Sequence, residues 1–119
     1  MLEGRVTRSG EPVVPIQLLL RKRPTTFPAV IDTGFNGHLC VPRRLLAGSR
    51  WQLVGTEQFE IATGAVVKQA IYVGEAIFAG RRGLVYTVAT EAHDILIGTK
   101  LLRGHTLTIN FRAGRVSIR

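Results

Sequence analysis

Ala29-Val30-Ile31-Asp32-Thr33-Gly34 is the stretch that decides the fold, because an apolar run ends there in a turn that carries a carboxylate. Gly34 allows the backbone to turn sharply, and Thr33 supplies a short hydroxyl that can hold the turn through hydrogen bonds. An ordinary surface turn has a similar composition. Here a second apolar run, Leu39-Cys40-Val41, follows closely with Gly37 as a further turn residue. The turn is therefore expected to connect two buried strands.

A second motif lies about sixty residues later, where Ile95-Leu96-Ile97-Gly98 runs directly into Thr99-Lys100-Leu101-Leu102. Taken alone, the first of these segments is typical of a buried strand that ends at a turn. The second predicts a short helix over residues 99–103, ended by Gly104, with a strand over residues 105–111 after it.

Together, residues 29–42 and 94–111 resemble the retropepsin-like (clan AA) aspartic proteases. In these enzymes two large apolar residues and a glycine precede a short helix with a Leu-Leu pair. The loop from Asp32 to Phe35 is most similar to the small bacterial and archaeal members, which read Asp-Thr-Gly-Phe. The resemblance implies an all-β fold: a small closed β-barrel of the retropepsin (acid protease) type with one short C-terminal helix. It also implies site roles: Asp32 is catalytic, Thr33 and Gly34 form the active-site loop, and Leu96, Ile97 and Gly98 give structural support.

The chemistry of that family needs two carboxyls that share one proton. The only other aspartate is Asp94, and its neighbours, His93 and Ile95, do not repeat the Asp-Thr-Gly pattern. The second carboxyl must then come from another copy of the chain. The sequence therefore predicts a homodimeric aspartic endopeptidase that activates a water between two Asp32 side chains, acts on a peptide or protein substrate, and uses no cofactor.

Alternating apolar residues predict most of the remaining strands. Val14, Ile16, Leu18 and Leu20 mark one face of an early strand, and a hairpin is expected around Ala113-Gly114, with Leu107, Ile109, Phe111, Val116 and Ile118 on one face. A short helix is expected over residues 42–47, where Pro42 suits a first helical position.

Residues 57–62 and 66–73 are expected to form two strands joined by a two-residue tip, Thr63-Gly64. A plain surface hairpin and a flap over the substrate both fit this pattern, and the family resemblance favours the flap. The expected substrate-binding residues are accordingly Phe35, Asn36, Ala62, Thr63, Gly64 and Ala65.

One feature departs from the retroviral enzymes. Those enzymes carry acidic residues after the catalytic glycine and an arginine after the later glycine, and the two form an ion pair that braces the dimer. This chain has Phe35-Asn36-Gly37 and Thr99 at these places, so the ion pair is absent. Asn36 is expected to hydrogen-bond to the substrate backbone instead.

Length and composition predict one domain over residues 1–119, with 45% apolar residues. No apolar run is long enough to span a membrane, and the first residues lack the apolar segment of a signal peptide. A single cysteine, Cys40, excludes an intrachain disulfide, so a cytoplasmic location is expected. Cys40 and the nearby His38 are too few ligands for a metal site, and they are interpreted as a core residue and a loop residue.

The charge of +8 points to an acidic partner, of which nucleic acid is the obvious candidate. The basic residues are scattered along the chain and no aromatic residues are interleaved with them, which favours a solvated basic surface and makes nucleic acid an unlikely partner, although the charge leaves it open. Two alternative functions remain: a basic β-barrel module that binds nucleic acid, and a retropepsin fold that binds peptides without cleaving them.

Overall fold

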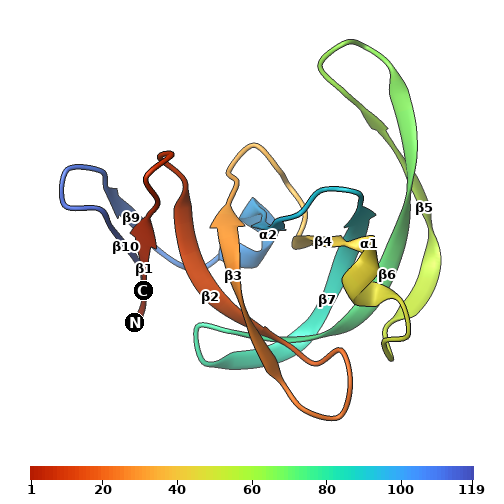
Figure 1. Cartoon of the computed structure of the whole chain (residues 1–119), viewed down its shortest axis with the longest axis horizontal. Coiled ribbons are helices and arrows are strands. Elements are labelled where there is room, and N and C mark those ends of the chain that lie inside the picture. Colours follow the sequence, from red (N-terminus) through yellow and green to blue (C-terminus); the bar gives the residue numbers. More distant parts are fainter.

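The computed structural model describes residues 1–119, which form ten strands and two helices of a single turn (Figure 1). The strands are β1 (Leu2–Val6), β2 (Pro12–Leu18), β3 (Thr25–Ile31), β4 (Leu39–Pro42), β5 (Gln52–Glu60), β6 (Val66–Phe78), β7 (Arg81–Thr90), β8 (Ile95–Ile97), β9 (Leu107–Asn110) and β10 (Arg115–Ile118). The helices are α1 (Arg43–Leu46) and α2 (Thr99–Leu102), both close to their predicted places. Neither helix is long or apolar enough to cross a membrane.

Six of the strands close into a barrel. Neighbouring strands follow the order β6-β7-β4-β8-β3-β2, and β2 then pairs with β6 through Gln17 to Ile77 and Leu18 to Ala76. Closure leaves these strands with no free edge over the paired segments. The predicted all-β closed barrel is therefore confirmed.

The barrel interior is filled by side chains from alternate positions. Val14, Ile16 and Leu18 of β2 are fully or almost fully buried, as the period-two pattern predicts. The opposite wall contributes Leu39 and Ile97, which are also fully buried. A second, smaller apolar cluster forms on the outer face of the wall around Cys40, Ile71 and Val88.

The order of the strands explains why the two sequence motifs meet. β3 and β4 are consecutive in the chain, yet β8 lies between them, parallel to β3 and antiparallel to β4. The connection from Asp32 to His38 must therefore cross the end of β8, where the chain leaves β8 for α2. Period-two patterns do not predict parallel pairing, and they also miss β1 and β7.

β5 and β6 form a long hairpin that extends beyond the barrel (Figure 1). The predicted strands at 57–62 and 66–73 are too short, since the observed strands run from Gln52 to Glu60 and from Val66 to Phe78. The two-residue tip is also wrong. The Ile61 N–H donates to the Ala65 carbonyl and the Gly64 N–H donates to the Ile61 carbonyl, so three residues form the tip. Gly64 has a φ of +85°, which glycine adopts without strain.

The terminal strands extend the sheet in the order β2-β1-β10-β9. The predicted hairpin around residues 113–114 is confirmed, but Phe111 lies in its turn with 65% of its surface exposed, rather than on the buried face. β10 is paired with β1 on one edge and with β9 on the other. Within the chain, β10 therefore has no free edge that could pair with a strand of another chain.

Candidate active site

Asp32 lies directly after β3 at the start of the loop that crosses β8, and its side chain is half-buried. Its backbone N–H donates to the Ile97 carbonyl at 2.9 Å, which extends the parallel pairing by one residue. The Gly34 N–H donates to Asp32 Oδ1 at 2.9 Å, a hydrogen bond to an acceptor that carries charge when ionised. Gly34 thus orients the carboxylate, and the second oxygen, Oδ2, makes no hydrogen bond within the chain.

The first turn of α2 holds the Asp32 loop through backbone hydrogen bonds. The N–H groups of Gly98, Thr99 and Lys100 donate to the carbonyls of His38, Phe35 and Gly37, at 2.9, 2.8 and 3.2 Å. The first N–H groups of a helix have no partner inside the helix, and here the loop supplies the acceptors. The loop is therefore fixed along most of its length.

Gly98 lies where the two motifs touch. A Cβ atom at this position would lie 2.2 Å from the Gly37 carbonyl oxygen and 2.6 Å from the Phe35 ring. Both distances are far below van der Waals contact, so only glycine allows the loop to lie this close to β8. Ile97 is fully buried in the barrel and Leu96 packs against the outer cluster. The predicted support residues thus lie under the loop or in the wall beside it.

Asn36 and Thr99 occupy the two positions at which the retroviral ion pair is missing. The Thr99 hydroxyl donates to the Asn36 amide oxygen at 3.4 Å. A neutral hydrogen bond within one chain therefore connects the positions that carry opposite charges in the retroviral enzymes. The amide NH₂ of Asn36, on an exposed residue, makes no hydrogen bond in the chain.

Asp94 lies far from Asp32. Ala29 pairs with Ile95 and Ile31 pairs with Ile97 in the parallel ladder, so Asp32 is level with Gly98 while Asp94 is level with Pro28. Four residues of strand separate them, which is about 13 Å. Asp94 is also exposed. One chain therefore brings a single aspartate, Asp32, to this end of the barrel wall.

A cavity of about 580 Å³ opens beside the Asp32 loop. Its lining includes the predicted residues Gly34, Phe35 and Asn36, whereas the hairpin-tip residues Ala62, Thr63, Gly64 and Ala65 lie outside it. Further lining residues come from the inner part of the hairpin and from its neighbours, namely Glu57, Phe59, Ile71, Tyr86, Thr87, Val88 and Lys100. None of these was predicted as a site residue, because β7 was missed and substrate binding was assigned to the tip of the hairpin rather than to its strands.

His38, which was interpreted as a loop residue, also contacts Tyr86 of β7. Its Nδ1 accepts the Tyr86 backbone N–H at 3.0 Å, and the two rings stack with their centroids 6.2 Å apart. Burial lowers the pKa of His38 below its usual 6.5, and the positive charges of Lys100 and Arg103 lower it further. The neutral ring is the form that can accept this hydrogen bond, since both ring nitrogens of a protonated histidine are donors. His38 thereby connects the Asp32 loop to β7.

Cys40 is buried in the outer cluster, as expected for a core residue. Burial, and to a lesser extent the negative charge of Asp32, raises the pKa of Cys40 from its usual 9.0 to about 11. The thiol is therefore protonated near neutral pH. No three His, Cys, Asp or Glu side chains gather where they would hold a metal ion.

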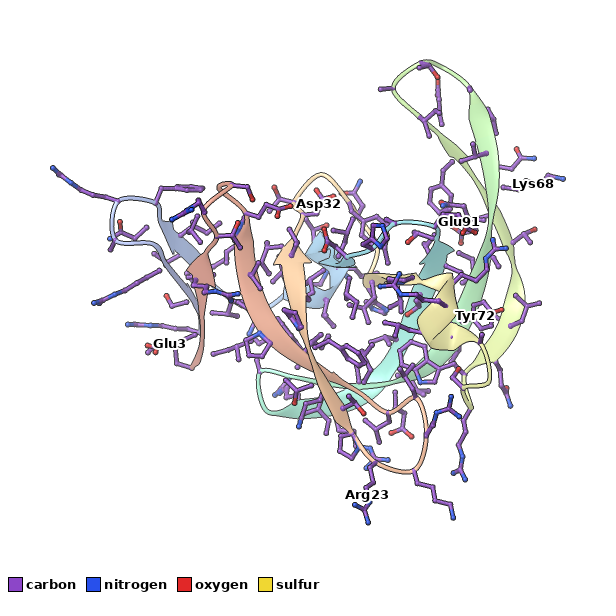
Figure 2. The ribbon with its side chains drawn as sticks, viewed as in Figure 1. Glu3, Arg23, Asp32, Lys68, Tyr72 and Glu91 are labelled. Carbon is purple, nitrogen blue, oxygen red and sulfur yellow. The ribbon has the colours of Figure 1, made fainter.

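Thr33 and Gly34 are both exposed at the turn. The Thr33 hydroxyl makes no hydrogen bond within the chain, so the expectation that it locks the loop is not met inside one chain. Asp32 lies on the upper side of the barrel in Figure 2, near the end at which the hairpin projects.

The sequence matches no protein-family model and no curated protein. Solved structures do match. A retropepsin-like aspartic protease from Rickettsia conorii superposes with a TM-score of 0.67 over 96% of this chain and 86% of that one, at 12% identity. This chain has a retropepsin-like fold. The foamy viral protease-reverse transcriptase, solved in complex with an RNA/DNA hybrid, superposes with a TM-score of 0.62 at 17% identity. That match covers 82% of this chain and 13% of the viral protein, of which this chain thus spans a small part.

In this retropepsin-like fold, the half-buried Asp32 begins a loop that is held by hydrogen bonds from the end of β8 and the start of α2. The Asp32 carboxylate, oriented by one backbone N–H, lies beside a cavity with apolar and polar walls, and Glu57 is the acidic residue in the lining of that cavity. A carboxyl group such as that of Asp32 can take or give a proton, and two carboxyls that share one proton can do both at the same time.

Proposed function

We propose that the chain is an aspartic endopeptidase of the small bacterial and archaeal Asp-Thr-Gly-Phe type, active as a homodimer. The observation that carries this proposal is the Asp32 loop, which holds one carboxylate by a backbone hydrogen bond in a retropepsin-like fold. The only other aspartate is level with Pro28, four residues further down the barrel wall. One chain thus supplies half of the required pair.

In the proposed dimer, two Asp32 side chains face each other across a two-fold axis and hold a water between them. The ionised carboxyl removes a proton from the water as it attacks the peptide carbonyl carbon, and the protonated carboxyl donates its proton to the carbonyl oxygen. Two carboxyls this close do not both ionise at moderate pH, which keeps one proton on the pair.

The surroundings of Asp32 fit this role. The exposed hydroxyl of Thr33 has no partner in its own chain and is free to bond to the partner's loop. Asn36 presents an unused amide NH₂ to the backbone of a bound peptide, and Phe35 contributes to the cavity wall. The hairpin tip at residues 62–65 would close over the peptide, as hinged hairpins do in lidded sites.

The dimer contact needs surfaces that are free in one chain. β10 is unavailable for strand pairing, so an edge-to-edge contact would use the outer edge of β9, next to the exposed Phe111. With no charged pair at Asn36 and Thr99, this contact depends on apolar and backbone groups. We place the dimer in the cytoplasm, in keeping with the lone buried thiol.

A peptide-library digest tests the proposal. Wild type should cleave a subset of peptides, with the greatest rate on the acidic side of neutrality because the shared proton is lost as pH rises. Asp32→Asn should abolish cleavage and keep the fold, whereas the matched control Asp94→Asn should retain most of it. Cleavage by Asp32→Asn at the wild-type rate would refute the catalytic assignment. If wild type binds particular peptides but cleaves none of them, the chain is instead a retropepsin fold that binds peptides without cleaving them.

A further inference from the structure

Two loops at the end of the barrel remote from Asp32 bring four basic side chains together. Arg21, Lys22 and Arg23 lie in the turn between β2 and β3, and Arg50 lies between α1 and β5. With Thr25 and Gly48 they line a shallow recess of about 560 Å³ that has no apolar residue in its lining. We call these four residues the basic pole. Figure 2 shows Arg23 on the side of the molecule opposite Asp32.

The fold holds the basic pole in place. The Arg50 N–H donates to the Leu20 carbonyl at 2.8 Å, and the Trp51 indole N–H donates to the Leu19 carbonyl at 2.9 Å. The Trp51 ring is buried and leaves no room for a Cβ at Gly74. Arg21 Nη1 also donates to the Gly48 carbonyl at 3.1 Å, which joins the two loops directly. The backbones of the two loops and the side chain of Arg21 are therefore fixed before any ligand arrives, which lowers the ordering cost of binding.

No carboxylate balances these charges. The ion pairs of the chain join Arg43 to Glu91 and Arg82 to Glu75, and neither involves the basic pole. Glu75 is the acidic residue whose backbone is bonded to the end of β2, but Arg82 already holds its side chain at 2.6 Å. Four like charges in one recess repel one another in the free protein, and an anion would relieve that repulsion.

The chemistry of the recess selects among anionic partners. Three of its four cations are guanidinium groups, which bind phosphate oxygens in a bidentate manner. A protein partner would be expected to dock against apolar or aromatic anchors, and stable attachment to a bilayer needs an apolar insertion or a lipid chain in addition to basic charge, yet the lining contains no apolar side chain. Several cations spread over two loops fit a polymer with regularly spaced phosphates.

We propose that the basic pole binds the phosphate backbone of nucleic acid without reading its sequence. Sequence-independent contact is expected because the recess has no aromatic side chain to form a stacking platform for bases, and its cations suit phosphate oxygens. The proposal does not depend on catalysis, because the recess lies away from the Asp32 loop and shares no residue with the cavity beside it. Binding at the basic pole would leave the side with the Asp32 loop open.

Fluorescence anisotropy with a labelled 20-base-pair DNA duplex and a labelled 20-nucleotide RNA tests this, using the Asp32→Asn protein to prevent self-digestion. Four phosphate contacts predict a slope of log affinity against log salt near −3.6 for the duplex, or roughly a 100-fold loss of affinity between 50 and 200 mM salt. Replacing Arg21, Lys22, Arg23 and Arg50 together by Gln should weaken binding to every sequence at least about tenfold and bring the slope close to zero.

The matched control replaces Arg5, Arg112, Arg115 and Arg119 by Gln. These exposed residues lie on or beside β1 and β10, and their loss lowers the net charge of +8 by the same four units. The control should keep most of the affinity and the steep salt slope. Equal losses in the two variants, or a larger loss in the control, would overturn the assignment to the basic pole. Stronger competition by poly-glutamate or by phosphatidylserine vesicles than by unlabelled duplex would overturn the assignment to nucleic acid.

Discussion

Replacing Gly98 by Ala should destabilise the protein by about 3 to 5 kcal/mol. The new Cβ would lie 2.2 Å from the Gly37 carbonyl oxygen and 2.7 Å from the Phe35 carbonyl oxygen. Both are backbone atoms that accept hydrogen bonds from Lys100 and Thr99, so they cannot move away without loss of these bonds. Overpacking costs about 1 to 3 kcal/mol, and two weakened hydrogen bonds add about 1 kcal/mol each.

Urea unfolding followed by the fluorescence of Trp51 would measure this change. For a chain of this size, the expected loss corresponds to a fall in Tm of about 10 to 20 °C. Because the Asp32 loop lies on Gly98, peptide cleavage should fall as well, even at temperatures at which the variant stays folded. Gly83→Ala is the matched control, since an added Cβ at this exposed position in β7 meets no atom within 4 Å.

Gly83→Ala should change the unfolding free energy by less than about 1 kcal/mol. If Gly98→Ala is equally harmless, the close packing of the Asp32 loop on β8 is not what holds the loop, and the reasoning fails.

Two further predictions concern titrating groups near the Asp32 loop. The pKa of His38 is lowered in the folded state. The contribution of neutral His38 to the free energy of unfolding should therefore be fully present above pH 6.5, and it should be lost as the pH falls through the folded-state pKa. His38→Gln should remove this part of the acid sensitivity, while the control His93→Gln, at an exposed position, should not. Equal pH profiles of the unfolding free energy for wild type and His38→Gln would contradict the role of the His38 ring. Since the pKa of Cys40 rises from 9.0 to about 11, iodoacetamide should alkylate the native thiol at pH 8 about 100-fold more slowly than the unfolded one. Asp32→Asn should speed this reaction by removing the nearby negative charge, and native alkylation as fast as in urea would show that Cys40 is accessible.

Local patterns predicted several strands of the barrel and the neighbourhood of Asp32, and the family resemblance supplied the closure of the barrel. The alternation of Val14, Ile16 and Leu18 predicts a strand with one buried face, and the barrel buries that face. The Asp-Thr-Gly turn and the Ile-Leu-Ile-Gly segment each predict a strand end, and the structure places both ends together. Whether these residues act on a peptide stays a prediction.

Non-local features could not be predicted in the same way. β7 has buried residues at consecutive positions, Thr87, Val88 and Ala89, because one of its faces lines the barrel while the other packs against the outer cluster. Its pattern therefore lacks the alternation of a half-exposed strand. The hydrogen bond from Tyr86 to His38 and the meeting of Arg50 with Arg21 join residues far apart in sequence, and no local signal marks either pair.

Subunit mixing tests the central claim, that one Asp32 from each of two chains forms the catalytic pair. Wild-type chains are mixed with increasing amounts of Asp32→Asn chains at constant total concentration, with time for exchange, and peptide cleavage is measured. If both carboxyls are needed, activity should follow the square of the wild-type fraction, about a quarter of the full value at an equal mixture. Activity that falls only in proportion to the wild-type fraction, about half at that mixture, would mean that each chain works alone.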